Sequence, residues 1–347
     1  MRLLHTADWQ IGMKAANLGA AAGRVRAARL ETARDVVRLA SERGAEMLIL
    51  AGDTFEDNGV SRAIVEETAS ILTACACPVY VLPGNHDPLS TGSVWEHPVW
   101  ESAGMVRVFR EAVPVQAGPA TLYPCPLRGR WSNEDPAAWI SGAAAAGGLR
   151  IGIAHGTLQS PRGAPPDVER AHPIQPLDGL DYFALGHWHS TAIHDRAAYS
   201  GTPEPTRFGE RESGNVLIVD LRPDAPPRIE AVRTARLEWV SIEGDLAAAA
   251  RQLERIAEPG ATLVDCRLTG FLSAGEQSLL SRVQRTLSGS FLHFRLDASA
   301  LLPAPDDDAW FAQLPPGYLR EAAARLRTAG GETATRALLE LYGLLPR

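Results

Sequence analysis

Five short polar clusters, each placed directly after an apolar segment, constrain the fold of this 347-residue chain more than any other feature. The apolar segments have the length and composition of buried strands, and the ends of parallel strands meet at one edge of a sheet. Glycine in or beside each cluster allows the backbone to turn sharply there. The sequence therefore predicts that the polar side chains converge in one crevice. In chain order the clusters are Asp8-Trp9-Gln10, Gly52-Asp53, Gly84-Asn85-His86-Asp87, His155-Gly156 and Gly186-His187-Trp188-His189.

The segments around the first three clusters predict an α/β fold. In residues 23–43, Val25, Val36 and Leu39 recur at the spacing of one helix face. Strands that alternate with helices are typical of layered α/β domains. Helices are expected at residues 23–43 and 62–74, and strands at residues 2–6, 45–51, 78–82, 106–109, 120–123, 150–154, 182–185 and 215–220.

A second, smaller unit is predicted after residues 222–236, where the run Arg-Pro-Asp-Ala-Pro-Pro-Arg interrupts the pattern. Beyond it the sequence predicts strand, helix, strand, helix and strand at residues 238–242, 245–256, 262–269, 274–287 and 291–296, followed by two short amphipathic helices at 318–328 and 333–342. We therefore expect a domain at residues 1–235, a small α/β module at 236–300 and a helical segment at 301–347.

The composition excludes several classes of protein. No apolar run approaches the ~20 residues of a membrane span, and the N-terminus lacks a basic-then-apolar signal, so a cytoplasmic protein is expected. A formal net charge of −7 argues against a protein that coats nucleic acid, although bound metal ions would offset part of it. The four cysteines are too few and too scattered for a disulfide framework and are expected to be small buried residues: Cys75, Cys77, Cys125 and Cys266.

The residue types in the clusters are those of a metal centre. Carboxylate, amide and imidazole together suit borderline divalent ions such as manganese, iron or zinc. Asp53 is the natural bridge, since a shared anionic ligand reduces the repulsion between two ions, and ions at ~3.5–4 Å can clamp a phosphate and activate a water. His86 is expected to act beside the metals on the transition state, with Asp87 accepting a hydrogen bond from its second ring nitrogen.

Each cluster alone would be a weak signal. A lone histidine such as His155 is more often a hydrogen-bonded structural residue than a ligand, and a single His-X-His pair also occurs by chance. The Asn85-His86-Asp87 run is more specific, because these residues are a poor choice for a buried turn without function. All five clusters in this order, each at a strand end, make coincidence a weak explanation.

In order and spacing the five clusters resemble the signature of the calcineurin-like metallophosphoesterases: Asp-X-His, Gly-Asp, Gly-Asn-His-(Asp/Glu), His and Gly-His-X-His. The match runs from Leu3 to His189. The segments His5-Thr6-Ala7-Asp8-Trp9, Tyr199-Ser200-Gly201-Thr202-Pro203 and Arg207-Phe208-Gly209-Glu210 resemble the SbcD branch, the nuclease subunits of double-strand-break repair complexes. The resemblance implies a layered α/β fold, a β-sandwich flanked by helices, with the trailing α/β module as a capping module that contacts DNA.

The same resemblance implies the metal ligands. One metal would be held by Asp8, Asp53 and His189, and the other by Asp53, Asn85, His155 and His187, with His86 as the transition-state histidine. Gln10 stands where the family's first motif usually has a second histidine. Its carbonyl oxygen can still bind a cation, but more weakly for softer metals, so the first metal is expected to be looser. Glu56 stands where several relatives with strong exonuclease activity have a histidine, and its charge should repel a backbone phosphate.

The leading hypothesis is a metal-dependent phosphodiesterase, an SbcD-type DNA exonuclease and endonuclease in DNA repair, with two divalent ions, manganese first and iron or zinc as alternatives. The resemblance implies DNA and an SbcC-like ATPase as partners and allows a homodimer. Two alternatives stay open: a phosphodiesterase or phosphatase that acts on a nucleotide, and an inactive scaffold for the ATPase, with Gln10 as the first sign of decay.

Two surface features carry further expectations. Arginine-bearing loops are expected to form a phosphate track: Arg128 and Arg130 beside Trp131, Arg162, Arg207 and Arg211. The two C-terminal helices each carry an apolar stripe, which either packs on their own module or docks on the ATPase.

Overall fold

The computed structural model describes residues 1–143, 147–159, 172–303, 311, 312 and 314–343. The chain divides into two compact units, Met1–Glu238 and Trp239–Arg347. Within the described residues, no helix is both long enough and apolar enough to span a bilayer.

The first sheet of the first unit is built on parallel strands that are almost wholly apolar. All five residues of β2 (Met47–Ala51) are buried, as expected for a strand covered on both faces. The strand order is β14-β13-β1-β2-β3-β4, with β1 to β4 parallel and β13 and β14 antiparallel to their neighbours. The other strands are β1 (Arg2–Thr6), β3 (Val79–Leu82), β4 (Val106–Val108), β13 (Asn215–Asp220) and β14 (Arg228–Arg233).

The second sheet has the order β11-β12-β10-β7-β6-β5. Its four central strands, β12, β10, β7 and β6, run parallel, while β11 and β5 are antiparallel edge strands. The bounds are β5 (Val115–Ala117), β6 (Ala120–Cys125), β7 (Leu149–His155), β10 (Tyr182–Gly186), β11 (Ala192–His194) and β12 (Ala197–Tyr199). A separate short pair is formed by β8 (Thr157–Leu158) and β9 (Pro173–Ile174).

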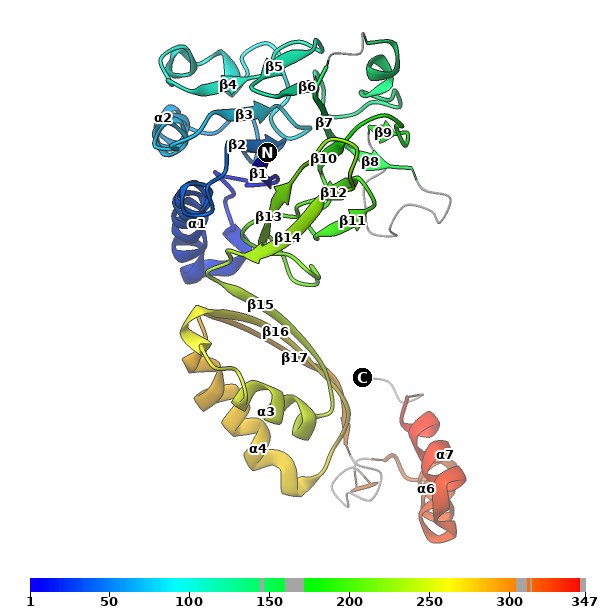
Figure 1. Ribbon diagram of the computed structural model, residues 1–347. Coiled ribbons are helices and arrows are strands. Elements are labelled where there is room, and N and C mark those ends of the chain that lie inside the picture. The colour runs from blue at the N-terminus through cyan, green and yellow to red at the C-terminus, as the bar shows by residue number, and fades with distance from the viewer. Residues whose placement is uncertain (144–146, 160–171, 304–310, 313, 344–347) are drawn as a thin grey trace. The chain divides into compact units, whose positions relative to one another are not determined.

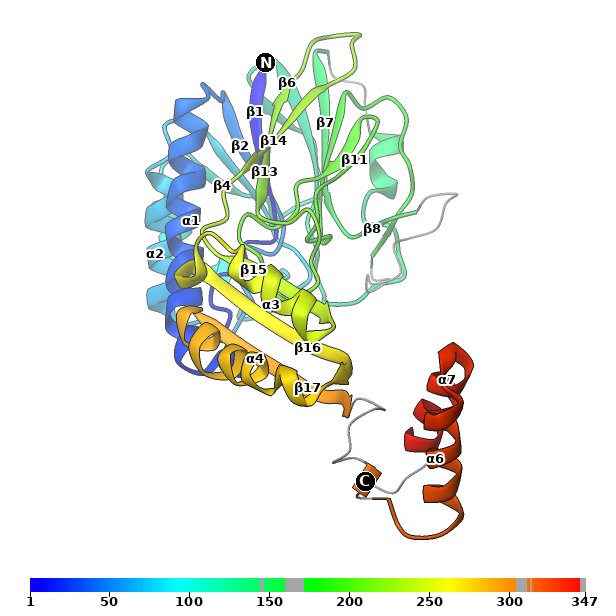
Figure 2. The same cartoon turned by 90° about the horizontal axis from the view of Figure 1, so that it is seen from below.

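Alternation along the strands builds the layers of the first unit. Leu48 and Leu50 of β2 pack in a core with residues of α1 (Ala22–Glu42) and α2 (Arg62–Thr73). Met47 and Ile49, on the other face of the same strand, pack with residues of the second sheet. Figures 1 and 2 show both helices on the outer face of the first sheet. The expected fold, a layered α/β sandwich flanked by helices, is confirmed.

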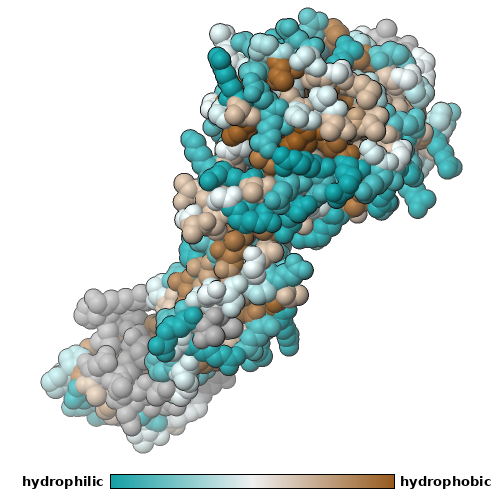
Figure 3. Space-filling model, turned by 90° about the vertical axis from the view of Figure 1, so that its left-hand side faces the viewer, coloured by the Kyte–Doolittle hydropathy of each residue, from teal (hydrophilic) through white to brown (hydrophobic). Residues whose placement is uncertain are grey.

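One strand of this unit was not expected. Residues 222–236, where the boundary was predicted, contain β14, which pairs antiparallel with β13 across the register Asn215 to Arg233, and the first unit ends at Glu238. The Pro-rich run is therefore the turn of a hairpin in the first sheet. On the face in Figure 3, hydrophilic residues cover most of the visible surface of this unit, and hydrophobic ones lie between them in small groups.

The second unit contains a small α/β module, as expected. Its sheet has the order β15-β16-β17, and α3 and α4 contribute to the core beside it. The elements are β15 (Glu238–Gly244), α3 (Leu246–Glu254), β16 (Thr262–Leu272), α4 (Gln277–Arg282) and β17 (His293–Pro303). The division into domain, capping module and helical segment stays a prediction.

The helices α6 (Tyr318–Ala329) and α7 (Gly331–Gly343) pack on each other through Ala323, Leu326 and Leu338. Their docking on an ATPase stays a prediction. The remaining described elements are short helical segments: η1 (Ala16–Ala21), η2 (Val94–Glu96), η3 (Pro98–Glu101), η4 (Ala138–Gly142), η5 (Pro259–Ala261), η6 (Ala274–Glu276), η7 (Val283–Leu287) and η8 (Ser288–Ser290).

Candidate metal centre

The side chains predicted as ligands all stand at the carboxyl ends of parallel strands. Asp8, Asp53 and Asn85 follow β1, β2 and β3 of the first sheet. In the second sheet, His155 is the last residue of β7, and the Gly186-His187-Trp188-His189 cluster begins at the end of β10. Gly186 lies opposite His155 in the parallel register, so the two histidine clusters are neighbours. The structure therefore brings side chains from both sheets together at one site.

Four residues of the site have a left-handed backbone, which residues other than glycine seldom adopt. The φ angle is 55° at Asp8, 49° at Gln10, 52° at Asp53 and 101° at His187. Such conformations cost free energy and persist only where the surrounding structure enforces them. We infer that this strain is part of how the site is built, since it falls on the side chains that converge.

Two glycines are required here by the close approach of other atoms. A Cβ atom at Gly84 would stand 2.4 Å from the backbone nitrogen of Asp53 and 2.2 Å from its Oδ1. A Cβ atom at Gly52 would stand 2.1 Å from Nδ1 of His155, and Gly52 also has a φ of 98°. Any side chain at either position would push the ligand residues apart.

The first half of the centre, here called the asparagine group, consists of Asn85, His155 and His187 together with Asp53. Oδ1 of Asn85 lies 2.8 Å from Nε2 of His155 and 3.1 Å from Nδ1 of His187. Nε2 of His155 is also 3.3 Å from Oδ2 of Asp53. His155, Asn85 and Asp53 are buried, so these donor atoms face one another away from bulk water.

The protonation of His155 shows that a cation fits the asparagine group. Nδ1 of His155 lies 2.9 Å from the carbonyl oxygen of Ala51, which can only accept, so Nδ1 carries the proton. In the neutral ring, Nε2 would then point a lone pair at the oxygens of Asn85 and Asp53. That arrangement is repulsive unless a positive charge, a second proton or a metal ion, lies among the three atoms.

The second half, called the glutamine group, consists of Asp8, Gln10 and His189 together with Asp53. Nε2 of Gln10 donates to Oδ2 of Asp53 at 3.1 Å, and Nε2 of His189 is 3.9 Å from Oδ1 of Asp8. Both oxygens of Asp8 accept from the backbone N–H of His187 at 3.1 Å. Asp8, Asp53 and His155 each place a donor atom within 4.8 Å of the others, so the two groups meet at Asp53.

His189 is held by two residues for which no role was predicted. Nδ1 of His189 donates to Oε1 of Glu210 at 2.7 Å and lies 2.9 Å from the hydroxyl of Thr206. Oε2 of Glu210 accepts from the N–H of Thr206 at 2.9 Å, which fixes the loop. With Nδ1 engaged, Nε2 is the nitrogen left for a metal, and the carboxylate increases its basicity. In the sequence, Glu210 stands out only as part of the run that resembles the SbcD branch, and Thr206 lies outside the motifs.

A buried arginine joins the loop of Thr206 to the strand end of Gln10. Arg29 of α1 donates to the carbonyl oxygens of Trp9 and Pro205, both at 2.8 Å. Glu204 of the same loop is also buried. Its carboxylate accepts from the hydroxyl of Thr32 at 2.7 Å and from the N–H groups of Arg236 and Leu237 at 2.8 and 3.0 Å. Both sides of the glutamine group are therefore tied to α1.

His86 reaches the site from the turn after β3. Its Nδ1 lies 2.8 Å from the carbonyl oxygen of Glu56, and its backbone N–H donates to Oδ1 of Asp53 at 2.9 Å. The predicted contact with Asp87 is wrong, because the two oxygens of Asp87 accept from the backbone N–H groups of Gly84 and Phe55, at 2.7 and 3.0 Å. Asp87 is buried beneath the turn and holds its shape, and the carbonyl of Glu56 orients His86.

Burial and mutual charge set the protonation of the centre. Burial raises the pKa of Asp8, against the nearby positive charges of His155 and His189. Burial also opposes ionisation of Asp53, but the charge and hydrogen bond of His155 outweigh it and hold the pKa of Asp53 below its usual value. Burial likewise disfavours the charged form of His155, and Asp53 overcomes it, raising the pKa of His155 to about 9. The charged form of these buried carboxylates is therefore stable only with positive charge beside it.

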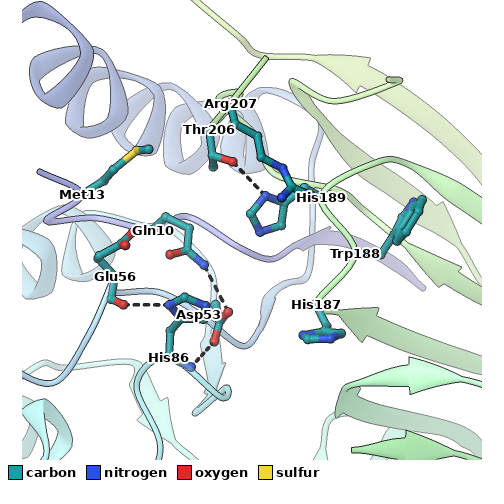
Figure 4. A pocket seen from close by; sticks show the side chains of 10 residues that line it. All are labelled: Gln10, Met13, Asp53, Glu56, His86, His187, Trp188, His189, Thr206 and Arg207. Carbon is teal, nitrogen blue, oxygen red and sulfur yellow. Dashed lines mark hydrogen bonds between the residues drawn. The ribbon is translucent and has the colours of Figure 1, made fainter. Parts of the chain in front are cut away.

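A pocket of about 350 Å³ opens over the centre. Figure 4 shows how its lining side chains surround the space: Gln10, Met13, Asp53, Glu56, His86, His187, Trp188, His189, Thr206 and Arg207. The carboxylate of Glu56 makes one part of the pocket lining acidic, and the guanidinium of Arg207 makes another part basic. Of the other arginines expected on a phosphate track, Arg128, Arg130 and Arg211 are exposed, and Arg162 lies outside the described residues.

Comparison with known proteins agrees with this geometry. A family model described as calcineurin-like phosphoesterase matches residues 1–191. YhaO of Bacillus subtilis, described as an uncharacterized metallophosphoesterase, is 28% identical over 212 residues, which cover 57% of this chain and 51% of YhaO. The chain thus spans about half the length of that relative.

Two further proteins show a weaker likeness. The SbcD component of the nuclease SbcCD from Escherichia coli K12 is 26% identical over 310 residues, which cover 74% of each chain, so this likeness continues beyond residue 191. The crystal structure of a dimetal phosphatase from Danio rerio is 12% identical, with a TM-score of 0.42, and the match covers 67% of this chain and 96% of that one.

Proposed function

The chain belongs to the calcineurin-like phosphoesterases, metal-dependent hydrolases of phosphate esters, and on that premise we propose that it cleaves phosphodiester bonds in DNA. One observation carries the proposal: two groups of oxygen and nitrogen donors meet at one buried carboxylate, Asp53, with His86 beside them. The donor set contains no thiolate, so we place manganese first, with iron or zinc as alternatives.

The ligand residues fall into two sets, one for each metal ion. Asp8, Gln10 and His189 would hold one ion, Asn85, His155 and His187 the other, and Asp53 both. Two such ions supply Lewis acidity toward a phosphate oxygen and lower the pKa of a water.

His86 acts without holding a metal. Its Nδ1 proton is engaged by the carbonyl of Glu56, so Nε2 is the atom left for the substrate. From there the imidazolium can donate to a phosphate oxygen or to the leaving oxygen. Arg207, exposed on the rim of the pocket, is placed to contact a neighbouring phosphate.

DNA is the favoured substrate because the likeness to the SbcD component of nuclease SbcCD extends over both units of the chain. On the same ground we propose exonuclease and endonuclease activity in DNA repair, and an SbcC-like ATPase as partner. A second copy of the chain is a further proposed partner. The module Glu238–Pro303 is the proposed DNA cap.

A second candidate is a phosphodiesterase that acts on a free nucleotide. The pocket of about 350 Å³ is at the small end of the range for ligand sites, and the Glu56 carboxylate in its wall would repel the continuing backbone of a polynucleotide. This reading needs no partner ATPase.

The two candidates separate in one experiment. The purified protein, with and without Mn²⁺, is given labelled single- and double-stranded DNA, a cyclic nucleotide and bis(p-nitrophenyl) phosphate. We expect Mn²⁺-dependent cleavage of DNA and of the model ester. Hydrolysis of the nucleotide and the ester with all DNA intact would support the second candidate. No hydrolysis of any substrate would contradict both.

A further inference from the structure

The segment that follows β6 presents an exposed tryptophan. Trp131 is 57% exposed, the largest exposed fraction among the large apolar side chains described in the first unit. The buried tryptophans Trp9 and Trp95 of the same unit are 2% and 0% exposed. A single exposed apolar side chain is common on a folded protein, so a binding role for this ring depends on how it is held and on the charges around it.

This segment is fixed to two turns of the metal centre. The N–H of Leu127 donates to the carbonyl of Pro83 at 3.2 Å, and the carbonyl of Leu127 accepts from Leu89 at 2.8 Å. Pro83 and Leu89 lie on either side of the turn that carries Asn85 and His86. One end of the segment is therefore bound to the turn of the proposed catalytic histidine.

The other end is held by His172, next to His155. Nε2 of His172 lies 3.1 Å from the carbonyl oxygen of Arg130, and its backbone N–H donates to the carbonyl of Ser132 at 2.9 Å. The carbonyl of His172 accepts from Thr157 at 3.1 Å, two residues beyond His155. Trp131 thus stands between two backbone positions that one buried histidine fixes. Its ring is presented without the entropy cost of ordering a free loop.

The charges around Trp131 suit a polyanion. Arg128 and Arg130 are exposed, and neither forms an ion pair with any residue that the structure describes. One guanidinium nitrogen of Arg128 donates to the carbonyl oxygen of Arg110 at 3.2 Å, which helps to hold this side chain in place. On the acidic side, Asp135 is engaged by the N–H groups of Ala137 and Gln175, at 2.8 and 2.9 Å. Glu134 is then the exposed negative charge closest in sequence.

We propose that Trp131, with Arg128 and Arg130, forms a binding site for single-stranded DNA beside the metal centre, with a base stacked on the indole and phosphates on the two guanidinium groups. The inference rests on the proposed nuclease function. Single strands are favoured over duplex because only an unpaired base offers its flat face to a side chain, and aromatic rings flanked by arginine are the usual platform for it.

The test measures binding apart from hydrolysis. A fluorescein-labelled oligothymidine of about 12 nucleotides is titrated with metal-free protein in EDTA, and anisotropy gives the dissociation constant. We expect Trp131→Ala to weaken binding by about 10- to 100-fold, Trp131→Phe to keep most of the affinity, and Trp131→Leu to behave like the alanine variant. Tyr318→Ala, which removes a 92% exposed ring from the second unit, is the matched control and should leave the affinity unchanged.

Two further measurements complete the design. Arg128→Ala and Arg130→Ala should each lower the slope of log affinity against log salt by about 0.7, the value for one phosphate contact to a single strand. With Mn²⁺ restored, hydrolysis of bis(p-nitrophenyl) phosphate by Trp131→Ala should equal that of the unmutated protein.

The possible outcomes distinguish the proposed stacking site from the proposed nuclease function. Equal DNA affinity of Trp131→Ala and the unmutated protein overturns the stacking site and leaves the nuclease function standing. Equal affinity of the leucine and phenylalanine variants shows an apolar contact, such as a protein interface, and overturns it too. A fall in model-ester hydrolysis by Trp131→Ala would trace the effect to the fold and also overturns it. An unmutated protein that neither binds nor cleaves DNA overturns both proposals.

Discussion

The two halves of the metal centre are assembled in different ways. In the asparagine group the donor atoms already lie 2.8 to 3.3 Å apart. His155 is the last residue of β7, and Asn85 lies in the short turn that follows β3. In the glutamine group, Nε2 of His189 is 3.9 Å from Asp8, and His189 is held by Glu210 and Thr206 of a later loop. The sheets position ligands of both groups, and the glutamine group depends in addition on the packing of this loop. We therefore expect the ion of the glutamine group to bind more weakly.

The largest effect is expected where the two halves meet. Asp53→Asn removes the shared charge, so two ions would stand together with no anion between them. We expect hydrolysis of bis(p-nitrophenyl) phosphate to fall at least about 1,000-fold, because the ions supply several kcal/mol of transition-state stabilisation. The fold should persist, since the amide oxygen of asparagine can still accept from the N–H of His86.

Asp220→Asn is the control for that variant, because Asp220 pairs with Arg2 at the other end of β1. Full metal content together with activity within tenfold of the unmutated protein in Asp53→Asn would refute the shared-carboxylate model.

His86→Ala should lower turnover while both metal ions stay bound. Loss of one transition-state donor costs ~2.7–4 kcal/mol, a fall of ~100- to 1,000-fold in turnover. Metal analysis of the purified variant should show the same content as the unmutated protein. A variant that has lost an ion would make His86 a ligand and would require the two groups to be redrawn.

Glu210→Gln should weaken one half alone. A glutamine keeps the size of the side chain but removes the charge that supports Nδ1 of His189. Changes to such supporting residues usually cost ~10- to 100-fold in metal affinity. Calorimetric titration of the metal-free protein with Mn²⁺ should show a loss at the weaker site and none at the tighter one. Glu212→Gln, at an exposed carboxylate two residues away, is the matched control. Equal losses at both sites would mean that the halves are not independent.

Gln10→His should have the smallest effect, in the opposite direction. Imidazole is a better ligand than a neutral amide for manganese, iron or zinc, and histidine tolerates the φ of 49° at this position. We expect the weaker site to tighten by about tenfold, roughly 1.4 kcal/mol. Unchanged affinity in the same titration would show that Gln10 serves Asp53 as a hydrogen-bond donor and does not face the metal.

The parts of the fold that sequence reasoning found are those with a strong apolar signal. β2 reads Met-Leu-Ile-Leu-Ala and is buried throughout, and β13 was predicted with its observed bounds, Asn215–Asp220. β14 was missed because it is an edge strand with charged, exposed residues beside a Pro-rich turn. β11 and β12 have three residues each, too few for alternation to show.

The residues of the metal centre also fall into those that the sequence predicts and those that it does not. Residues at strand ends follow from the order of the strands, since parallel strands bring their carboxyl ends together. The support of His189 by Glu210 does not, because it joins residues 21 positions apart through an irregular loop. Asp87 shows the converse error: it adjoins His86 in sequence, yet its side chain turns to the backbone of Gly84 and Phe55.

The network of Arg29 and Glu204 also fixes when the centre can form during synthesis. Arg29 contacts the carbonyls of Trp9 and Pro205, and Glu204 accepts from the N–H groups of Arg236 and Leu237. A chain that leaves the ribosome from its N-terminus has the first of these residues long before the last. Until residue 237 has emerged, a buried carboxylate lacks two of its donors and the glutamine group lacks its clamp. Nascent chains of this hydrolase should therefore stay inactive until the whole first unit has been made.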